Sequence, residues 1–119
     1  MKKLLFIVNP KAGKTKSNAP LFDAVAAFSR AGYLVRVFLT EAPMFDVVAR
    51  FSQAGYLIKL FITEGPGDAK RAAAELGGQF DLVVCAGGDG TLNETISGLM
   101  ELERRPLLGY LPNGSTNDF

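Results

Sequence analysis

Short apolar runs alternate with amphipathic segments along most of the chain. Residues 3–8 form an apolar run, which predicts a strand buried on both faces. Residues 21–31 place apolar side chains on one helical face and are followed by Gly32, which favours a helix that ends there. Residues 33–39 are rich in β-branched and aromatic side chains, so they predict a second strand.

The helix and strand pattern then occurs a second time. Residues 21–43 and 44–66 align without a gap, and 14 of the 23 positions are identical. Most of the remaining pairs are conservative, such as Val35 with Ile58. Two copies are too few for a solenoid, which needs about three repeats to bury its faces. We therefore expect a tandem repeat in which each copy folds as one helix and one strand.

The second half of the chain continues the alternation. The pattern predicts helices at residues 67–76 and 91–102 and strands at residues 80–86 and 107–111. Alternating strands and helices are typical of an α/β fold, here a doubly wound, Rossmann-like and mostly parallel sheet of about five strands. Right-handed crossovers allow the strand order 3-2-1-4-5, in which the second copy supplies an edge strand. An apolar edge of that kind can pair with another chain, which makes this edge a candidate homodimer interface.

Composition limits the class of protein. A chain of 119 residues is long enough for one domain with its own core, and a net charge of +1 does not favour a nucleic-acid partner. The absence of histidine excludes a histidine-based triad and the usual zinc sites. The single cysteine, Cys85, lies in an apolar strand and fits a reducing compartment. The apolar run near the amino terminus is too short for a signal peptide, so a cytoplasmic domain is expected.

A glycine-rich turn follows the strand predicted at residues 80–86. Gly87, Gly88 and Gly90 flank Asp89, and a helical pattern follows. Glycines let backbone N–H groups approach the oxygen atoms of a ligand, and a helix N-terminus favours anions. The same four residues also form a common tight turn, so the turn alone leaves a phosphate site and a plain connection equally open. The strand-turn-helix context favours the phosphate site.

The loop after the first strand carries three lysines. Gly13 and Lys14 suggest a Walker motif, but that motif needs a glycine where Val8 stands, so we reject it. These lysines are either a solvated loop or a group that attracts phosphate. In a parallel sheet the loops that follow the strands share one edge, where ligands bind. The lysine loop, the loop after Thr63, the glycine turn and residues 113–118 are therefore expected to lie together.

Three of these segments resemble a known family. Residues 9–14 (NPKAGK), 87–94 (GGDGTLNE) and 111–119 (LPNGSTNDF) are similar to the three signatures of the diacylglycerol kinase catalytic domain, and most of all to bacterial soluble diacylglycerol and related lipid kinases. The GGDGT segment alone is equally typical of NAD kinases. The first and third segments favour the lipid kinases, and a NAD kinase-like lobe stays as the alternative.

The resemblance implies a Mg²⁺-dependent transfer of the γ-phosphoryl group of ATP to a lipid hydroxyl. It implies Asp89 as the catalytic residue, which would orient the phosphates through a metal ion or water and thus contact Mg²⁺ only indirectly. Thr63 is preferred to Thr40 as the threonine of the nucleotide site, although the expected strand order places Thr40 nearer the centre. The implied nucleotide contacts are Asn9, Lys14, Thr63, Gly87, Gly88, Asp89, Gly90, Thr91, Asn93, Glu94 and Ser115, the last of which is usually threonine in the family.

Two departures from the family pattern affect the expected activity. Family members carry a second, mostly β domain after the Asn-Asp-Phe segment, and this domain contributes to the lipid site. They also carry one helix-strand unit where this chain has two. Residues 1–119 are therefore expected to be a nucleotide-binding lobe that binds ATP without turnover, while the longer enzyme contacts its lipid substrate at a membrane surface transiently. The other alternative is a rearranged, non-catalytic domain that associates with itself.

Overall fold

The computed structural model describes residues 2–10, 35–37 and 44–112. The helix predicted at residues 21–31 lies outside this part of the chain. The described elements are β1 (Lys2–Val8), β2 (Val35–Val37), α2 (Met44–Gln53), β3 (Tyr56–Ile62), α3 (Asp68–Leu76), the short 3₁₀ helix η1 (Gly77–Gln79), β4 (Leu82–Gly87), α4 (Asp89–Leu99) and β5 (Leu107–Pro112).

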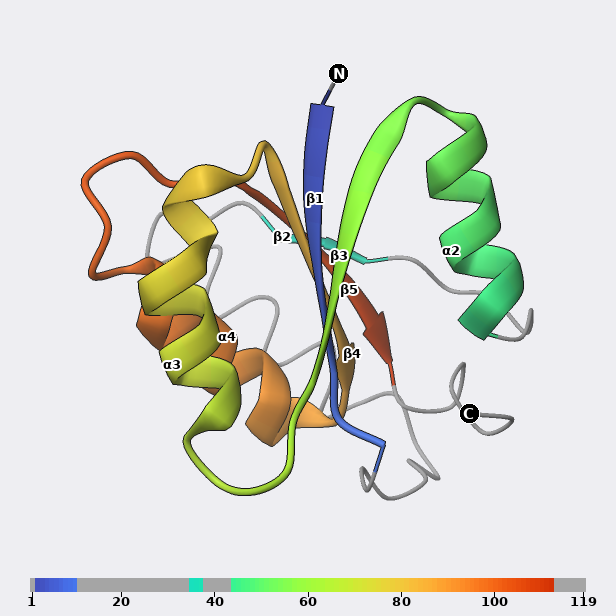
Figure 1. The fold of residues 1–119 in the computed structure, drawn as a ribbon. Coiled ribbons are helices and arrows are strands. Elements are labelled where there is room, and N and C mark those ends of the chain that lie inside the picture. The colour runs from blue at the N-terminus through green and yellow to red at the C-terminus, as the bar shows by residue number, and fades with distance from the viewer. Residues whose placement is uncertain (1, 11–34, 38–43, 113–119) are drawn as a thin grey trace.

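The strands form one parallel sheet in the order β2-β5-β4-β1-β3 (Figure 1). β1 pairs with β3 over seven residues, from Lys2 with Tyr56 to Val8 with Ile62. On its other side β1 pairs with β4 over five residues. The α/β fold with a doubly wound, parallel sheet is therefore confirmed.

The predicted strand order, however, is wrong. The strand of the second copy, β3, lies beside β1, whereas the described part of β2 lies at the opposite edge and pairs with β5. The chain after each strand explains the difference. β3 leads into α3 through Gly67, which has φ 88°, and Asp68, whose carboxylate accepts two loop N–H groups. The aligned positions after the first copy are Met44 and Phe45, so the glycine and the aspartate of this turn are both absent there.

Helices cover both faces of the sheet. Figure 1 shows α3 and α4 together on one face and α2 on the other. Leu5 and Ile7 pack in the cluster that includes α3 and α4, whereas Leu4 and Phe6 pack in the cluster that includes Val47 of α2. Successive residues of a strand point to opposite faces, so a strand buried on both reads as a continuous apolar run.

The second copy packs as a complete helix-strand unit. The rings of Phe51 in α2 and Tyr56 in β3 meet edge to face, with centroids 5.9 Å apart. Val48 and Ile58 are half-buried against the same core cluster as Val47. This part of the tandem repeat therefore folds as expected, while the helix of the first copy stays a prediction.

α3 and α4 lie in close contact, and this contact shapes the site edge. A Cβ atom on Gly98 of α4 would lie 2.3 Å from the carbonyl oxygen of Lys70 and 2.8 Å from the Cβ atom of Ala73, both in α3. Ala69, Ala72 and Ala73 are buried on the α3 side of the core. The small side chains let the two helices approach closely, and both helices begin at the same edge of the sheet because each follows a parallel strand.

β3 leaves apolar side chains at the edge of the sheet. Leu57, Leu60 and Ile62 are 57%, 44% and 47% exposed. Lys59 is exposed between them, and lysine on an edge strand disfavours pairing with another chain. The apolar edge is thus present, and the homodimer stays a prediction. No helix in the described part of the chain is long and apolar enough to cross a membrane.

Candidate functional site

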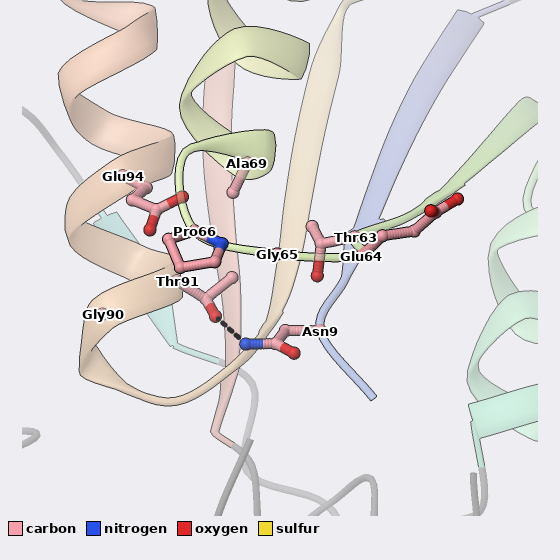
Figure 2. A pocket seen from close by; sticks show the side chains of 9 residues that line it. All are labelled: Asn9, Thr63, Glu64, Gly65, Pro66, Ala69, Gly90, Thr91 and Glu94. Carbon is pink, nitrogen blue, oxygen red and sulfur yellow. Dashed lines mark hydrogen bonds between the residues drawn. The ribbon is translucent and has the colours of Figure 1, made fainter. Parts of the chain in front are cut away.

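A cavity of about 240 Å³ opens at the carboxyl ends of β1 and β3, between the N-terminal ends of α3 and α4 (Figure 2). It collects residues from three separate segments of the chain, residues 9, 63–69 and 90–94. The lining residues are Asn9, Thr63, Glu64, Gly65, Pro66, Ala69, Gly90, Thr91 and Glu94. This edge is where ligands bind in open parallel sheets.

Asn9 connects the end of β1 to α4. Its backbone N–H donates to the carbonyl oxygen of Ala86 at 2.9 Å, and its Nδ2 donates to Oγ1 of Thr91 at 3.1 Å, the dashed line in Figure 2. Thr91 is buried. The two hydrogen bonds hold the first turn of α4 against the end of the central strand.

The glycine turn is shaped by close contacts at Gly87. This residue has φ 157°, and a Cβ atom there would lie 2.6 Å from Oγ1 of Thr91 and 3.2 Å from Cβ of Asn9. Only glycine fits this position without movement of its neighbours. The carbonyl oxygen of Gly87 accepts a hydrogen bond from the hydroxyl of Tyr110 at 3.2 Å.

Tyr110 orients the backbone of the turn from inside the core. Its side chain is buried, and burial raises the pKa of the phenol, so the hydroxyl remains a protonated donor. Because Tyr110 holds the carbonyl of Gly87 inward, the N–H of Gly88 in the same trans peptide points the opposite way. Sequence reasoning missed Tyr110, which reads as an ordinary apolar strand residue.

The N-terminus of α4 offers backbone N–H groups to the cavity. α4 begins at Asp89 after Gly88, and no side chain among the described residues caps it. Nothing lies within 4 Å of a Cβ atom placed on Gly90, so the space above the first turn is open. Asp89, the first residue of α4, is exposed. Free N–H groups at a helix N-terminus suit an anion.

The loop from Thr63 to Gly67 forms the opposite wall. The N–H of Thr63 donates to the carbonyl oxygen of Val8 at 2.8 Å, which continues the pairing of β1 and β3. Thr63 is 6% exposed and lines the cavity. Two carboxylates accept hydrogen bonds from the backbone of this loop. Asp68 accepts from the N–H groups of Glu64 and Gly65, and Glu94 accepts from the N–H of Gly67.

Asp68 is held as a carboxylate by its surroundings. The N–H of Glu64 lowers its pKa most, opposed by desolvation, and the N–H of Gly65 and the guanidinium of Arg71 lower it further. Arg71 also forms an ion pair with Asp68. The loop is therefore organised around a charged acceptor at ordinary pH.

The structure brings together part of the predicted nucleotide set. Asn9, Thr63, Gly90, Thr91 and Glu94 line the cavity, and Gly87, Gly88 and Asp89 directly precede Gly90 in the chain without being among the lining residues. Asn93 is exposed on α4 and is not among the lining residues. The predicted contacts that lie outside the described residues are Lys14 and Ser115, and the alternative threonine, Thr40, also lies there.

Comparison with known proteins identifies the family. The sequence model of the diacylglycerol kinase catalytic domain matches residues 44–119, which begin at the first residue of the second copy. The chain belongs to this family. It is 50% identical over its whole length to a diacylglycerol kinase of Bacillus subtilis (strain 168) and 44% identical over 99% of its length to one of Staphylococcus epidermidis (strain RP62A).

The chain corresponds to about a third of these relatives, 32% and 30% of their lengths. The crystal structure of a diacylglycerol kinase from Bacillus anthracis str. Sterne shares the fold, with a TM-score of 0.61 and 30% identity, over 93% of this chain and 30% of that one. The family resemblance of the three sequence segments is therefore confirmed.

Proposed function

We propose that this chain is the nucleotide-binding lobe of an ATP-dependent lipid kinase of the diacylglycerol kinase type. The observation that carries the proposal is the cavity in which Asn9, the Thr63 loop and the first turn of α4 meet at the carboxyl ends of the strands. The matched family and relatives named diacylglycerol kinase support the choice of reaction. In this reaction the γ-phosphoryl group of ATP passes to a lipid hydroxyl.

We assign the phosphates of ATP to the cavity. Its volume of about 240 Å³ is below the roughly 300–1,000 Å³ of pockets that enclose a whole small ligand. The open space over Gly90 and the uncapped N–H groups of α4 suit phosphate oxygens. Gly88 is extended, with φ −91° and ψ −170°, and its N–H points away from Tyr110. Thr91 stabilises the site through the hydrogen bond that its hydroxyl accepts from Asn9.

Asp89 is the acid that we assign to Mg²⁺, through water. No three metal-binding side chains lie together within the described ranges, so this part of the chain does not form a complete metal cage. Mg²⁺ bound mainly by phosphate oxygens and water needs only one or two carboxylates from a protein. When bound, the ion would neutralise charge on the transferred phosphoryl group. Asp89, exposed at the start of α4, fits that role.

Binding without turnover is the behaviour that we assign to residues 1–119. The relatives are about three times as long, so the lipid site, transient contact with a membrane surface and a cytoplasmic location are properties proposed for the longer protein. Mixed micelles of diacylglycerol with Mg²⁺ and ATP test this assignment, and we expect negligible transfer of labelled phosphate to lipid. Robust transfer by this chain alone would contradict it.

Titration of the chain with Mg·ATP by calorimetry tests the nucleotide site. Gly88→Val should abolish binding and leave the fold intact, because a branched residue tolerates the extended backbone of Gly88 and would occupy the path of the phosphates. Gly78→Val serves as the control, since Gly78 is exposed and its nearest neighbour would be an ordinary contact at 3.7 Å. Unchanged affinity in a folded Gly88→Val variant refutes the assignment.

A further inference from the structure

We propose that Glu94 and Asp68 are positioning residues that set the shape of the Thr63–Gly67 loop, and that Glu94 is not itself a ligand of the nucleotide. The resemblance to lipid kinases implied a direct nucleotide contact for Glu94. The inference rests on the proposed function only in assuming that this loop forms a wall of the ATP site.

Glu94 joins the two helices that border the cavity. Its Oε1 accepts a hydrogen bond at 3.0 Å from the N–H of Gly67, which lies 27 residues earlier in the chain. Gly67 has φ 88° and directly precedes α3, and its carbonyl oxygen accepts the N–H of Arg71 at 3.0 Å. Glu94 thereby fixes the left-handed residue at which the loop turns into the helix.

Asp68 fixes the other half of the loop. Its Oδ2 accepts the N–H of Glu64 at 2.8 Å and that of Gly65 at 3.0 Å, and its own N–H donates to the carbonyl oxygen of Gly65 at 3.3 Å. Three of the loop's N–H groups thus go to the two carboxylates. These groups are occupied by the protein, so phosphate binding falls to the glycine turn and the N-terminus of α4.

The two possible roles of Glu94 predict opposite effects of one substitution. As a hydrogen-bond acceptor, Glu94 can be replaced by glutamine, which keeps a carbonyl oxygen and removes a negative charge beside the phosphates. If Glu94 instead binds Mg²⁺ or the nucleotide through its negative charge, glutamine cannot replace it. Glu94→Gln therefore separates the two roles, and Glu94→Ala removes both.

Hydrogen exchange of the 119-residue chain without nucleotide tests the positioning role directly. In Glu94→Ala the amide of Gly67 should exchange about tenfold faster, the effect of losing one hydrogen bond to a charged group, whereas Glu94→Gln should stay within about threefold of the wild type. Glu75→Ala, an exposed glutamate of α3, is the matched control and should leave the Gly67 amide unchanged.

Asp68→Ala should speed exchange at the amides of Glu64 and Gly65 in the same experiment. Asp46→Ala, an exposed acid in the first turn of α2, provides the control for removing a helix-terminal carboxylate. Circular dichroism of each variant confirms that the fold is kept. Unchanged exchange at Gly67 in Glu94→Ala, or at Glu64 and Gly65 in Asp68→Ala, would overturn the inference.

Mg·ATP titration of the same variants completes the test. We expect Glu94→Gln to bind as the wild type does or several-fold more tightly, and Glu94→Ala to bind about tenfold more weakly. Equal loss of binding in both, with Gly67 still protected in Glu94→Gln, would make Glu94 a ligand and overturn the inference. Absence of Mg·ATP binding by the wild type would instead remove the proposed function, and the amide exchange would then decide the positioning role alone.

Discussion

Removing one copy of the repeat tests which features select the strand beside β1. A chain without residues 21–43 loses, from the described structure, only β2 and its three-residue pairing with β5. The pairing of β1 with β3 and β4, the packing of α2 to α4 and the cavity all remain. We expect this chain to fold and to keep the candidate site.

A chain without residues 44–66 has the same length and should build the same site from the other copy. The deletion joins Pro43 to Gly67 and Asp68, so it restores the turn that the first copy lacks. Ala42 then stands where Gly65 is, and a Cβ atom there would meet nothing within 4 Å. We therefore expect the strand of the first copy to pair with β1, with Thr40 in place of Thr63.

The second chain should be less stable than the first by about 2 kcal/mol. Val47, which is 9% exposed, is replaced by Ala24, and the half-buried Ile58 is replaced by Val35. Loss of buried methyl and methylene groups costs about 0.8 kcal/mol each, and Ile→Val alone about 0.5–1.5 kcal/mol. Ala24→Val with Val35→Ile in the second chain should restore most of the difference.

Urea denaturation of the three chains measures these stabilities, and equal slopes would show that each unfolds comparable surface. Equal stability of the two deletion chains, or no recovery with Ala24→Val and Val35→Ile, would refute the packing argument. If the chain without residues 21–43 fails to fold, β3 and its turn are not sufficient to complete the sheet beside β1, and the reasoning is refuted.

Four further predictions concern single residues. Gly90→Ala should raise the free energy of unfolding by up to about 1 kcal/mol, because alanine favours a helix more than glycine does. It should also weaken Mg·ATP binding, because its Cβ atom enters open space that we assign to phosphate. Unchanged affinity would show that the phosphates bind elsewhere. Gly98→Ala should instead lower the free energy of unfolding by about 1–3 kcal/mol, because its Cβ atom would lie 2.3 Å from a backbone oxygen of α3. The pKa of Asp68, followed by NMR, should lie below 3.8, and Arg71→Ala should raise it only in part because backbone N–H groups act more strongly. The contribution of Asp68 to stability is then complete above the ordinary carboxyl pKa and is lost as pH falls through the lowered value. Burial raises the pKa of the Cys85 thiol to about 12, so a thiol reagent at pH 8 should label it only as fast as the protein unfolds, and faster labelling would contradict its buried position.

The sequence predicted the elements well and their order poorly, for a physical reason. Apolar runs determine that residues 33–39 and 56–62 favour strands, and β2 and β3 lie within these ranges. Periodicity cannot decide which of two strands with the same apolar pattern pairs with β1. We attribute that choice to Gly67 and Asp68, whose turn connects only β3 to α3.

The candidate site was predictable where it followed a strand. Asn9, Thr63 and the glycine turn each come directly after a parallel strand, and the carboxyl ends of parallel strands share an edge. The hydrogen bond from Gly67 to Glu94 was not predictable, since it depends on how closely α3 and α4 approach at Gly98. The hydroxyl of Tyr110 was hidden within an apolar strand pattern.

The duplicated unit shows that a parallel sheet can contain an additional strand and keep its candidate site. The strand beside β1, β3, pairs with it over seven residues. It connects through the left-handed Gly67 to α3, whose buried side chains are small. At the opposite edge, the described part of β2 pairs with β5 from Val35 with Leu108 to Val37 with Tyr110. The cavity depends on the position beside β1 alone, because its lining comes from Asn9, the loop after β3, α3 and α4. Within the described structure, the strand beside β1 thus serves the site, and the strand beside β5 serves only the sheet.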